Sequence, residues 1–206
     1  MSAADLQHQP FIPEPTIPSS PSAELNATTT QRSYSYKELL PPRSSLSKAA
    51  SIETINTISV VGDQWQESPY QGSQLSKAQY DRVLSYVKAG KEEEATLAMG
   101  GEPCPINGKG YYIKPTVFTD VKDSMRIYHE EVFGPFVVIS QFEDEQEAIS
   151  RANSTSYGLS ASVFTNDLER AHRVAAEIEA GMVLINSSQD CDFRLPFGGV
   201  KQNGIG

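Results

Sequence analysis

Apolar runs and helical spacings alternate along the second half of the chain. Residues 136–142, 159–165 and 182–185 are near-continuous apolar runs, which predict strands buried on both faces of a sheet. Between them, residues 144–152 and 168–178 place apolar side chains at helical spacing. Strands that alternate with helices through short connections favour parallel pairing and right-handed crossovers. The predicted fold class is therefore α/β, a parallel sheet with flanking helices.

Capping signals and shorter apolar runs predict the remaining elements. Ser76 and Gln79 have the spacing of a capping box, in which the serine caps a backbone donor and the glutamine reaches back. The apolar positions that follow lie on one helical face: Tyr80, Val83, Leu84 and Val87. Residues 96–99 and 111–118 predict extended segments, because they are apolar, aromatic or β-branched. Gly181 is expected to be the C-cap glycine of the helix over residues 168–178.

The character of the chain changes near residue 60. Seven of the 13 prolines lie before residue 43, and the first glycine is Gly62. Residues 1–45 are rich in Ser, Thr, Pro and Ala and lack a sustained hydrophobic period, which is typical of disordered segments. The sequence therefore predicts a disordered extension over residues 1–45 and a domain over residues 46–206. Residues 45–62 are a candidate helix at the start of that domain.

Composition narrows the classes of function. A net charge of −9 without a Lys/Arg cluster argues against nucleic acid and against an anionic membrane surface. Apolar runs are too short to span a bilayer, and the N-terminus lacks the features of a secretory signal. The two cysteines, Cys104 and Cys191, are far apart and lack metal or redox spacing, so the simplest interpretation is a reduced, cytoplasmic compartment and no zinc site.

The stretch EEVFGPF, residues 130–136, stands out as candidate chemistry. Adjacent residues of an extended segment point to opposite sides, so Glu130 and Glu131 cannot both face one scissile bond. At most one of them turns inward. An inward carboxylate beside an aromatic and a glycine turn suits a ligand with hydroxyl groups, such as a ribose. The alternative is a solvated loop that precedes a strand.

Other candidates carry weaker signals. Cys191 lies in a loop after an apolar strand, where α/β folds place their sites, but flanking aspartates disfavour its thiolate. Cys104 lies in a loop and is expected to be a bystander. His129 is the histidine nearest to the acid pair, and a lone loop histidine is usually a solvated surface group. The glycine-rich residues 195–206 match neither a phosphate loop nor a dinucleotide fingerprint, so a tight backbone turn is expected there.

Several motifs in order resemble the C-terminal third of the aldehyde dehydrogenase superfamily. They lie between Gly62 and Gly206, and the match extends further if residues 45–62 are the preceding helix. The motifs are QLSKAQYDRVLSYVKAGKEEEATLAMGG (74–101), GYYIKPTVFTDV (110–121), EEVFGPFVVISQF (130–142), RANSTSYGLSASVFTND (151–167), AGMVLINSS (180–188) and PFGGVKQNGIG (196–206). EEVFGPF is the most specific of them.

The resemblance implies a reaction and a set of site residues. Enzymes of this family oxidise aldehydes with NAD or NADP, using a cysteine nucleophile and a glutamate that activates water. Glu131 matches the family glutamate that binds the nicotinamide ribose, and Phe133 matches the aromatic beside that ribose. Phe197 matches an aromatic of the substrate tunnel. Cys191 falls where many members carry another tunnel aromatic, which makes it a substitution in the tunnel wall.

Departures from the family pattern affect the expected activity. The family nucleophile falls near residues 30–35 of this sequence, where TQRSYS has no cysteine. The general base, the oxyanion-binding asparagine and the cofactor domain lie further upstream in the family, and its last helix and strand lie beyond Gly206. The resemblance therefore implies a truncated protein that keeps half of a NAD or NADP site and is inactive alone, a pseudoenzyme.

Three alternatives stay open. The chain could be a non-catalytic partner that docks onto a full-length aldehyde dehydrogenase or another protein through exposed sheet edges. It could be a fragment of a complete gene product. It could also be an enzyme of another class that reuses Glu131, His129 or Cys191 on the shared fold.

Overall fold

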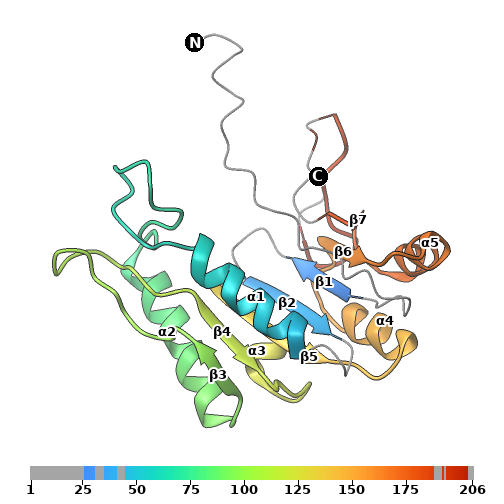
Figure 1. The fold of residues 1–206 in the computed structure, drawn as a ribbon, viewed down its shortest axis with the longest axis horizontal. Coiled ribbons are helices and arrows are strands. Elements are labelled where there is room, and N and C mark those ends of the chain that lie inside the picture. Colours follow the sequence, from blue (N-terminus) through green and yellow to red (C-terminus); the bar gives the residue numbers. More distant parts are fainter. Residues whose placement is uncertain (1–25, 31–34, 41–44, 188–191, 193, 204–206) are drawn as a thin grey trace.

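A seven-stranded sheet forms the centre of the molecule, and helices cover both of its faces (Figure 1). The computed structural model describes residues 26–30, 35–40, 45–187, 192 and 194–203. The strand order is β3-β4-β5-β2-β1-β6-β7. The strands are β1 (Asn26–Thr30), β2 (Ser35–Leu40), β3 (Thr96–Met99), β4 (Thr116–Thr119), β5 (Phe136–Gln141), β6 (Ser160–Phe164) and β7 (Met182–Ile185). The helices are α1 (Ser45–Ile58), α2 (Lys77–Glu92), α3 (Arg126–His129), α4 (Glu145–Asn153) and α5 (Leu168–Glu177).

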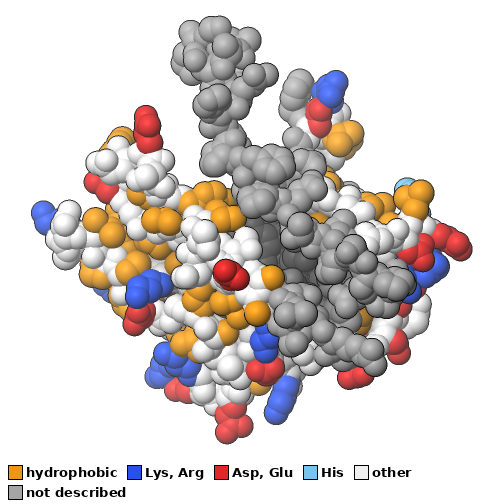
Figure 2. Space-filling model, viewed as in Figure 1, with side chains coloured by type: hydrophobic (Ala, Val, Ile, Leu, Met, Phe, Trp, Pro, Cys, Tyr) orange, Lys and Arg blue, Asp and Glu red, His pale blue; other side chains and the backbone are white. Residues whose placement is uncertain are grey.

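Alternation along β5 divides the core between the two faces of the sheet. Phe136 and Val138 pack with α2 in a cluster that includes Phe118, whose ring stacks on Phe136 at 5.3 Å. The intervening Val137 and Ile139 pack on the opposite face, against α1. Both faces of β5 are therefore covered, which explains its continuous apolar run. On the outer surface of the side that carries α1, apolar side chains are interspersed with charges of both signs (Figure 2).

Most of the elements predicted in the second half of the chain are present. The strands β5, β6 and β7 and the helices α4 and α5 lie within a few residues of the predicted ranges. Asp144 caps α4 by accepting from the Glu147 amide, and Asp167 caps α5 by accepting from the Arg170 amide. The prediction over 111–118 is confirmed only at its end, because β4 begins after Pro115. The candidate helix over residues 45–62 corresponds to α1.

The predicted α/β fold class is confirmed, although the sheet is mixed where parallel pairing was predicted. The pairs β4–β5, β5–β2 and β6–β7 are parallel, whereas β3–β4, β2–β1 and β1–β6 are antiparallel. The strands β5 and β6 are parallel in direction, but they are not neighbours, because β1 and β2 lie between them. The sequence pattern around α4 predicts the directions of β5 and β6, and it carries no information about what separates them.

Two stretches of the expected disordered extension belong to the sheet. The structure places β1 and β2 at its centre, where β2 pairs with β5 and β1 pairs with β6. Residues 1–25, 31–34 and 41–44 lie outside the described residues. The physical reason for the difference is the need of β5 and β6 for backbone partners, because unpaired inner edges are costly. A polar, Thr-rich segment can supply such hydrogen bonds without a hydrophobic pattern.

Gly181 has a different role from the predicted helix cap. The helix α5 ends at Glu177, and Ile178 occupies its C-cap position. A Cβ at Gly181 would lie 1.7 Å from the carbonyl oxygen of Gly198. The position therefore requires glycine because two backbone segments approach each other there.

Candidate functional site

The loop over residues 130–135 lies at the side of the sheet where β4, β5 and β6 begin, which we call the amino edge of the sheet. Thr116 of β4, Phe136 of β5 and Ser35 of β2 are partners in register. Further along the same edge, Thr30 of β1 is opposite Ser160 of β6. This row of residues marks the side of the sheet at which β4, β5 and β6 begin.

The backbone of this loop holds an aromatic side chain outward. Val132 is buried, whereas the next residue, Phe133, is 47% exposed and has a φ of 60°. A bulky residue in the left-handed region is a conformational outlier, and such strain is found at binding and switch sites. Gly134 follows, and a Cβ there would lie 2.4 Å from Val83 Cγ2. The chain therefore passes close over α2 directly after the exposed ring.

Two side chains of α2 hold the backbone of the loop. Gln79 Nε2 donates to the Phe133 carbonyl oxygen at 2.8 Å, and Arg82 Nη2 donates to the Glu131 carbonyl oxygen at 2.9 Å. Gln79 also caps the start of α2 much as predicted: its amide donates to Ser76 Oγ, and its Oε1 reaches back to accept from the amide of Leu75, the residue before the N-cap. One residue therefore fixes both the start of α2 and the loop that crosses it.

The two glutamates have different surroundings. Tyr86 is buried, and its hydroxyl donates to Glu130 Oε2 at 2.7 Å, while Arg126 Nε donates to the same oxygen at 3.0 Å. The hydrogen bond from Tyr86 lowers the pKa of Glu130, and Arg126 adds to this effect. Burial raises the pKa of Tyr86, and its hydrogen bond to Glu130 raises it further. Glu130 thus contacts α2 and α3. Its neighbour Glu131 is half-buried, and because the chain is extended here, its side chain points to the opposite side.

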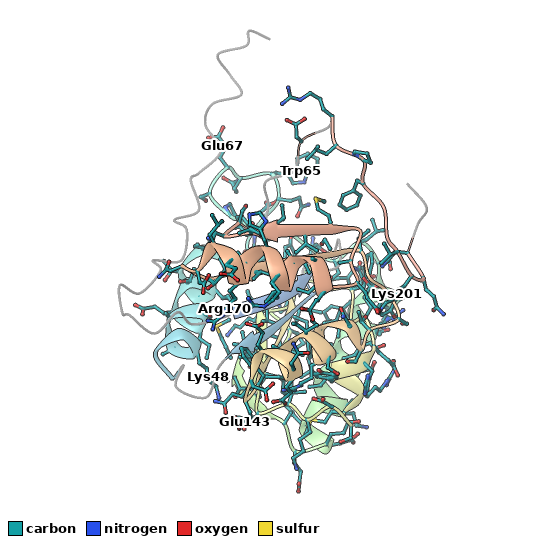
Figure 3. All side chains as sticks on the ribbon, turned by 90° about the vertical axis from the view of Figure 1, so that its right-hand side faces the viewer. Lys48, Trp65, Glu67, Glu143, Arg170 and Lys201 are labelled. Atoms are coloured by element: carbon teal, nitrogen blue, oxygen red, sulfur yellow. The ribbon has the colours of Figure 1, made fainter. Side chains whose placement is uncertain are left out.

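The segment over residues 196–203 returns to the same edge of the sheet. The amide of Val200 donates to the Gly158 carbonyl oxygen, and the amide of Gln202 donates to that of Ser156. Lys201, labelled in Figure 3, donates to the Asn153 carbonyl oxygen at 2.6 Å and pairs with a carboxylate of the turn after α5. Phe197 is half-buried within this segment. We refer to residues 196–203 as the closing segment.

The predicted site residues that the structure describes therefore lie at the same side of the sheet, but in two separate groups. Glu131 and Phe133 lie in the loop before β5, and Phe197 lies in the closing segment beside the starts of β6 and β7. The strands β2 and β1 separate these two groups in the sheet. Cys191, the predicted substitution in the tunnel wall, lies outside the described residues.

The weaker candidates have surface or structural surroundings. His129 is exposed, and its ring packs edge-on against Tyr128 at 5.2 Å. Burial raises the pKa of the Cys104 thiol, which disfavours the reactive thiolate. Within the described residues, His, Cys, Asp and Glu form no group suited to a metal ion. No helix among them is long and apolar enough to cross a membrane.

Sequence reasoning missed the side chains that support the loop. Gln79 was identified only as a capping residue, and Arg82 and Tyr86 were not identified at all. Their spacing of three and four residues places all three on one face of α2. A polar and aromatic face at helical spacing is a usable signal, but it does not identify its partner loop. The short helix α3 was missed because four residues are too few to show a period.

Comparison with known proteins gives a consistent set of relatives. The model of the aldehyde dehydrogenase family matches residues 42–206, so β1 and β2 precede the first matched residue. An aldehyde dehydrogenase-like protein of Schizosaccharomyces pombe is 50% identical over 147 residues, which cover 71% of this chain and 29% of the relative. A betaine aldehyde dehydrogenase of Sinorhizobium fredii is 51% identical over 148 residues, 71% of this chain and 30% of the relative.

Solved structures agree with these relatives. The NAD+ complex of an aldehyde dehydrogenase from Bacillus cereus is 40% identical, with a TM-score of 0.75. The match covers 80% of this chain and 33% of that chain. The chain thus spans about 30% of the length of the curated relatives that it matches.

Proposed function

Since the chain belongs to the aldehyde dehydrogenase family, we propose that Glu131 and Phe133 form the nicotinamide-ribose side of a NAD or NADP site. We further propose that the 206-residue chain does not oxidise aldehydes by itself. The observation that carries the first proposal is the loop before β5, which presents a half-buried carboxylate and an exposed aromatic ring two residues apart.

The geometry of the loop fits a ribose and its attached base. A carboxylate accepts two hydrogen bonds, which matches the two hydroxyl groups of a ribose. The Phe133 ring is held outward by a left-handed backbone, so it can pack on an apolar face without prior rearrangement. When bound, the nicotinamide supplies the acceptor for a hydride. The residues of this chain would orient the ribose and cover the base from one side.

The proposal of inactivity depends on the cysteines. The family reaction needs a thiolate nucleophile, and the segment near residues 30–35, where the resemblance places it, contains none. The elevated pKa of Cys104 disfavours its thiolate, and Asp190 and Asp192 flank Cys191 in sequence. A reduced, cytoplasmic compartment is consistent with this cysteine usage.

A binding experiment tests the assignment of Glu131 and Phe133 to the nicotinamide ribose. Nicotinamide mononucleotide is the appropriate probe, because it contains only the half of the cofactor that Glu131 and Phe133 would contact. In a titration followed by NMR, we expect shifts of the amides over residues 131–134 and an affinity about tenfold weaker for Glu131→Gln, since a carboxylate acceptor is lost. Glu92→Gln, on the exposed end of α2, is the matched control. Equal affinities of the wild type and Glu131→Gln would overturn the assignment.

An activity assay tests the second part. The purified chain is incubated with NAD or NADP and a series of aldehydes, and reduction of the nicotinamide is followed by absorbance. We expect no rate above that of a heat-inactivated sample. A rate that is above this background and is abolished by Cys191→Ser would identify a nucleophile and overturn the proposal.

One observation favours a second candidate, a non-catalytic partner of a full-length aldehyde dehydrogenase. The strand β7 is an edge of the sheet, and all four of its side chains are only half-buried. Val200 of the closing segment, which is 60% exposed, is hydrogen-bonded to the loop beside this edge. An exposed strand edge can accept a strand from another chain. Light scattering of the chain mixed with a full-length relative tests this, and unchanged masses of both proteins would count against it.

A further inference from the structure

The hairpin of β1 and β2 is set apart from the rest of the domain in the sequence, although it lies inside the sheet. The family model begins at residue 42, so both strands precede the first matched residue. They nevertheless lie in the middle of the sheet (Figure 1), where β2 pairs with β5 and β1 pairs with β6. The hairpin therefore fills a slot between two family-matched strands, and residues 41–44 join it to α1.

Backbone pairing joins the hairpin to this slot. Residues 35–40 are opposite residues 136–141, and residues 26–30 are opposite residues 160–164, so each strand is paired along its whole length. The sequence of β1 is NATTT and that of β2 is SYKELL, which lack a strong hydrophobic pattern. Strands of this kind are prone to alternate pairing and to domain swapping. The slot of a second copy offers the same backbone donors and acceptors in the same register.

The chain leaves β2 and enters α1 at one edge of the sheet. Leu40, the last residue of β2, is opposite Gln141, the last residue of β5. Near the start of α1, Lys48 pairs with Asp120, which directly follows β4. Since β2, β4 and β5 are parallel, both points lie at the edge where these strands end, which we call the carboxyl edge. The chain therefore reverses its direction between Leu40 and Ser45.

The sequence of this connection opposes such a reversal. Residues 41–44 are Pro-Pro-Arg-Ser. A residue that precedes a proline is biased toward extended backbone, which here applies to both Leu40 and Pro41. Short connections that disfavour the closed form promote domain swapping. An extended connection spans about 17 Å from Leu40 to Ser45, which is enough to carry the hairpin to an adjacent copy.

Helix α1 is anchored independently of the hairpin. Ile52 and Ile55 pack against apolar side chains of β4 and β5 on one face of the sheet. Lys48 Nζ lies 3.2 Å from Asp120 Oδ1 at the carboxyl edge. These contacts keep α1 on its own copy when the hairpin leaves, so the point of exchange lies between β2 and α1.

We propose that two copies of this chain exchange their β1–β2 hairpins and form a swapped dimer. In the dimer, β2 of each copy pairs with β5 of the other, and β1 pairs with β6 of the other. The backbone pairing of the closed form is thereby remade, and the connection adopts the extended conformation that its prolines favour. The connections cross at the carboxyl edges, which leaves the amino edges accessible.

The exchange affects the candidate site, because β2 and β1 separate the loop before β5 from the closing segment. In the swapped dimer, the strands between these two groups come from the other copy. The spacing of Glu131 and Phe133 from the closing segment therefore depends on dimerisation. The exchange itself does not depend on whether the site binds a nicotinamide ribose.

Engineered disulfides test which chain supplies the hairpin. Thr28 of β1 is opposite Ser162 of β6, and such pairs have Cα separations that a disulfide can bridge. Thr28→Cys and Ser162→Cys are placed on separate chains, one with an affinity tag, in a background of Cys104→Ser and Cys191→Ser. The two chains are unfolded, mixed, refolded and oxidised. We expect a covalent dimer of one tagged and one untagged chain on a non-reducing gel.

A chain with both Thr28→Cys and Ser162→Cys provides the contrast. A closed chain forms the disulfide within itself, whereas the swapped dimer forms two disulfides between its copies. Thr96→Cys with Thr119→Cys is the matched control, because these residues are opposite each other in β3 and β4 and should crosslink within one chain in either form. A dimer fraction whose chains carry the disulfide between β1 and β6 internally would overturn the exchange.

Substitutions in the connection give a test that needs no disulfide. Pro41→Ala combined with Pro42→Ala removes the bias toward extended backbone. Light scattering of samples refolded over a range of concentrations measures the dissociation constant of the dimer. We expect this constant to rise about tenfold in the double variant and to stay unchanged in the control Pro105→Ala, an exposed proline of another loop.

A wild type that stays monomeric over the whole range would overturn the proposal, as would an unchanged dissociation constant in the double variant. If the variants at Thr28 and Ser162 fail to fold, cysteines at Thr30 and Ser160, the next opposite pair on the same side of these strands, are used in the same way.

Discussion

The two halves of the sheet hold their loops at the amino edge by different means. In the first half, residues 62–141, large buried side chains such as Tyr86, Phe118 and Phe136 support α2 against β4 and β5. In the second half, residues 142–203, the core is made mostly of alanine and valine. Large side chains in the first half give a rigid base from which polar side chains reach the loop. In the second half, glycine lets two backbone segments approach each other directly, as at Gly181 and Gly198.

The loop before β5 and the closing segment differ in the groups that hold them in place. The loop before β5 is held through side chains that donate to its carbonyl oxygens, so its strained backbone can be tuned by single substitutions on α2. The closing segment makes close backbone contacts at Gly181 and at Gly158, and the Lys201 side chain adds to them. A site held by side chains is adjustable, whereas a site held by close backbone contact tolerates almost no added volume.

Separating the two halves of the sheet should cause the largest loss of stability. Thr28→Pro in β1 removes a backbone donor from a strand paired on both sides, and proline is incompatible with a central strand. We expect the largest loss of the set, upward of about 3 kcal/mol by analogy with a proline inside a helix. Urea denaturation gives the magnitude, and hydrogen exchange should show β5 and β6 losing protection while α2 keeps it.

Thr28→Val is the matched control, because it keeps the backbone donor and the β-branched shape. If the amides of β5 and β6 stay protected in Thr28→Pro, the hairpin of β1 and β2 does not join the two halves, and the sheet order would have to be revised.

A methyl group at Gly181 should act on the second half alone. In Gly181→Ala, the Cβ would lie 1.7 Å from the Gly198 carbonyl oxygen, so one of the two backbone segments must move. Overpacking of this kind costs about 1–3 kcal/mol. Limited proteolysis should cut the closing segment faster, with the loop over residues 130–135 unaffected. Gly72→Ala, where φ lies outside the left-handed region and an added Cβ would meet one side-chain atom at 3.3 Å, is a control for the loss of a glycine elsewhere.

The smallest effect is expected from Tyr86→Phe, which probes the side-chain contacts of the first half. The substitution removes one hydroxyl, and we expect a loss of about 0.5–1 kcal/mol at neutral pH. Because Tyr86 lowers the pKa of Glu130 in the folded protein, this stabilisation is present above the unfolded pKa and is lost as the pH falls through the folded pKa. The difference between wild type and variant should therefore shrink below about pH 4.

Chemical denaturation at neutral and acidic pH measures this change. A difference that stays constant across the acidic range would show that the hydroxyl contributes through packing and not through the ionised Glu130.

Local patterns in the sequence predicted most elements of the fold, and the missing information concerns distant partners. Asp144 and Asp167 signal the starts of α4 and α5 through contacts within one turn, which a single sequence contains. The position of β1 and β2 depends on edges contributed by β5 and β6, so it follows only from the assembled sheet.

At the site, too, local patterns were predictable and contacts between distant segments were not. The alternation of an extended chain predicted that Glu130 and Glu131 diverge, and the structure engages Glu130 with Tyr86 and Arg126. The roles of Glu131, Phe133 and Phe197 come from the family resemblance and stay predictions. The supporting face of α2 was not predictable, because Arg82 contacts a residue 49 positions away in the chain.

The central position of β1 also has a consequence for the order of events in folding. Its partner β6 lies roughly 130 residues later in the chain, so the pairing has a high contact order and forms slowly. During synthesis, β1 and β2 emerge before their partners and must wait until the residues between them have been made. Until β5 and β6 have been made, the free edges of β2 and β1 are exposed and can recruit strands from other molecules. A chaperone that covers these edges during synthesis would therefore favour correct assembly of the sheet.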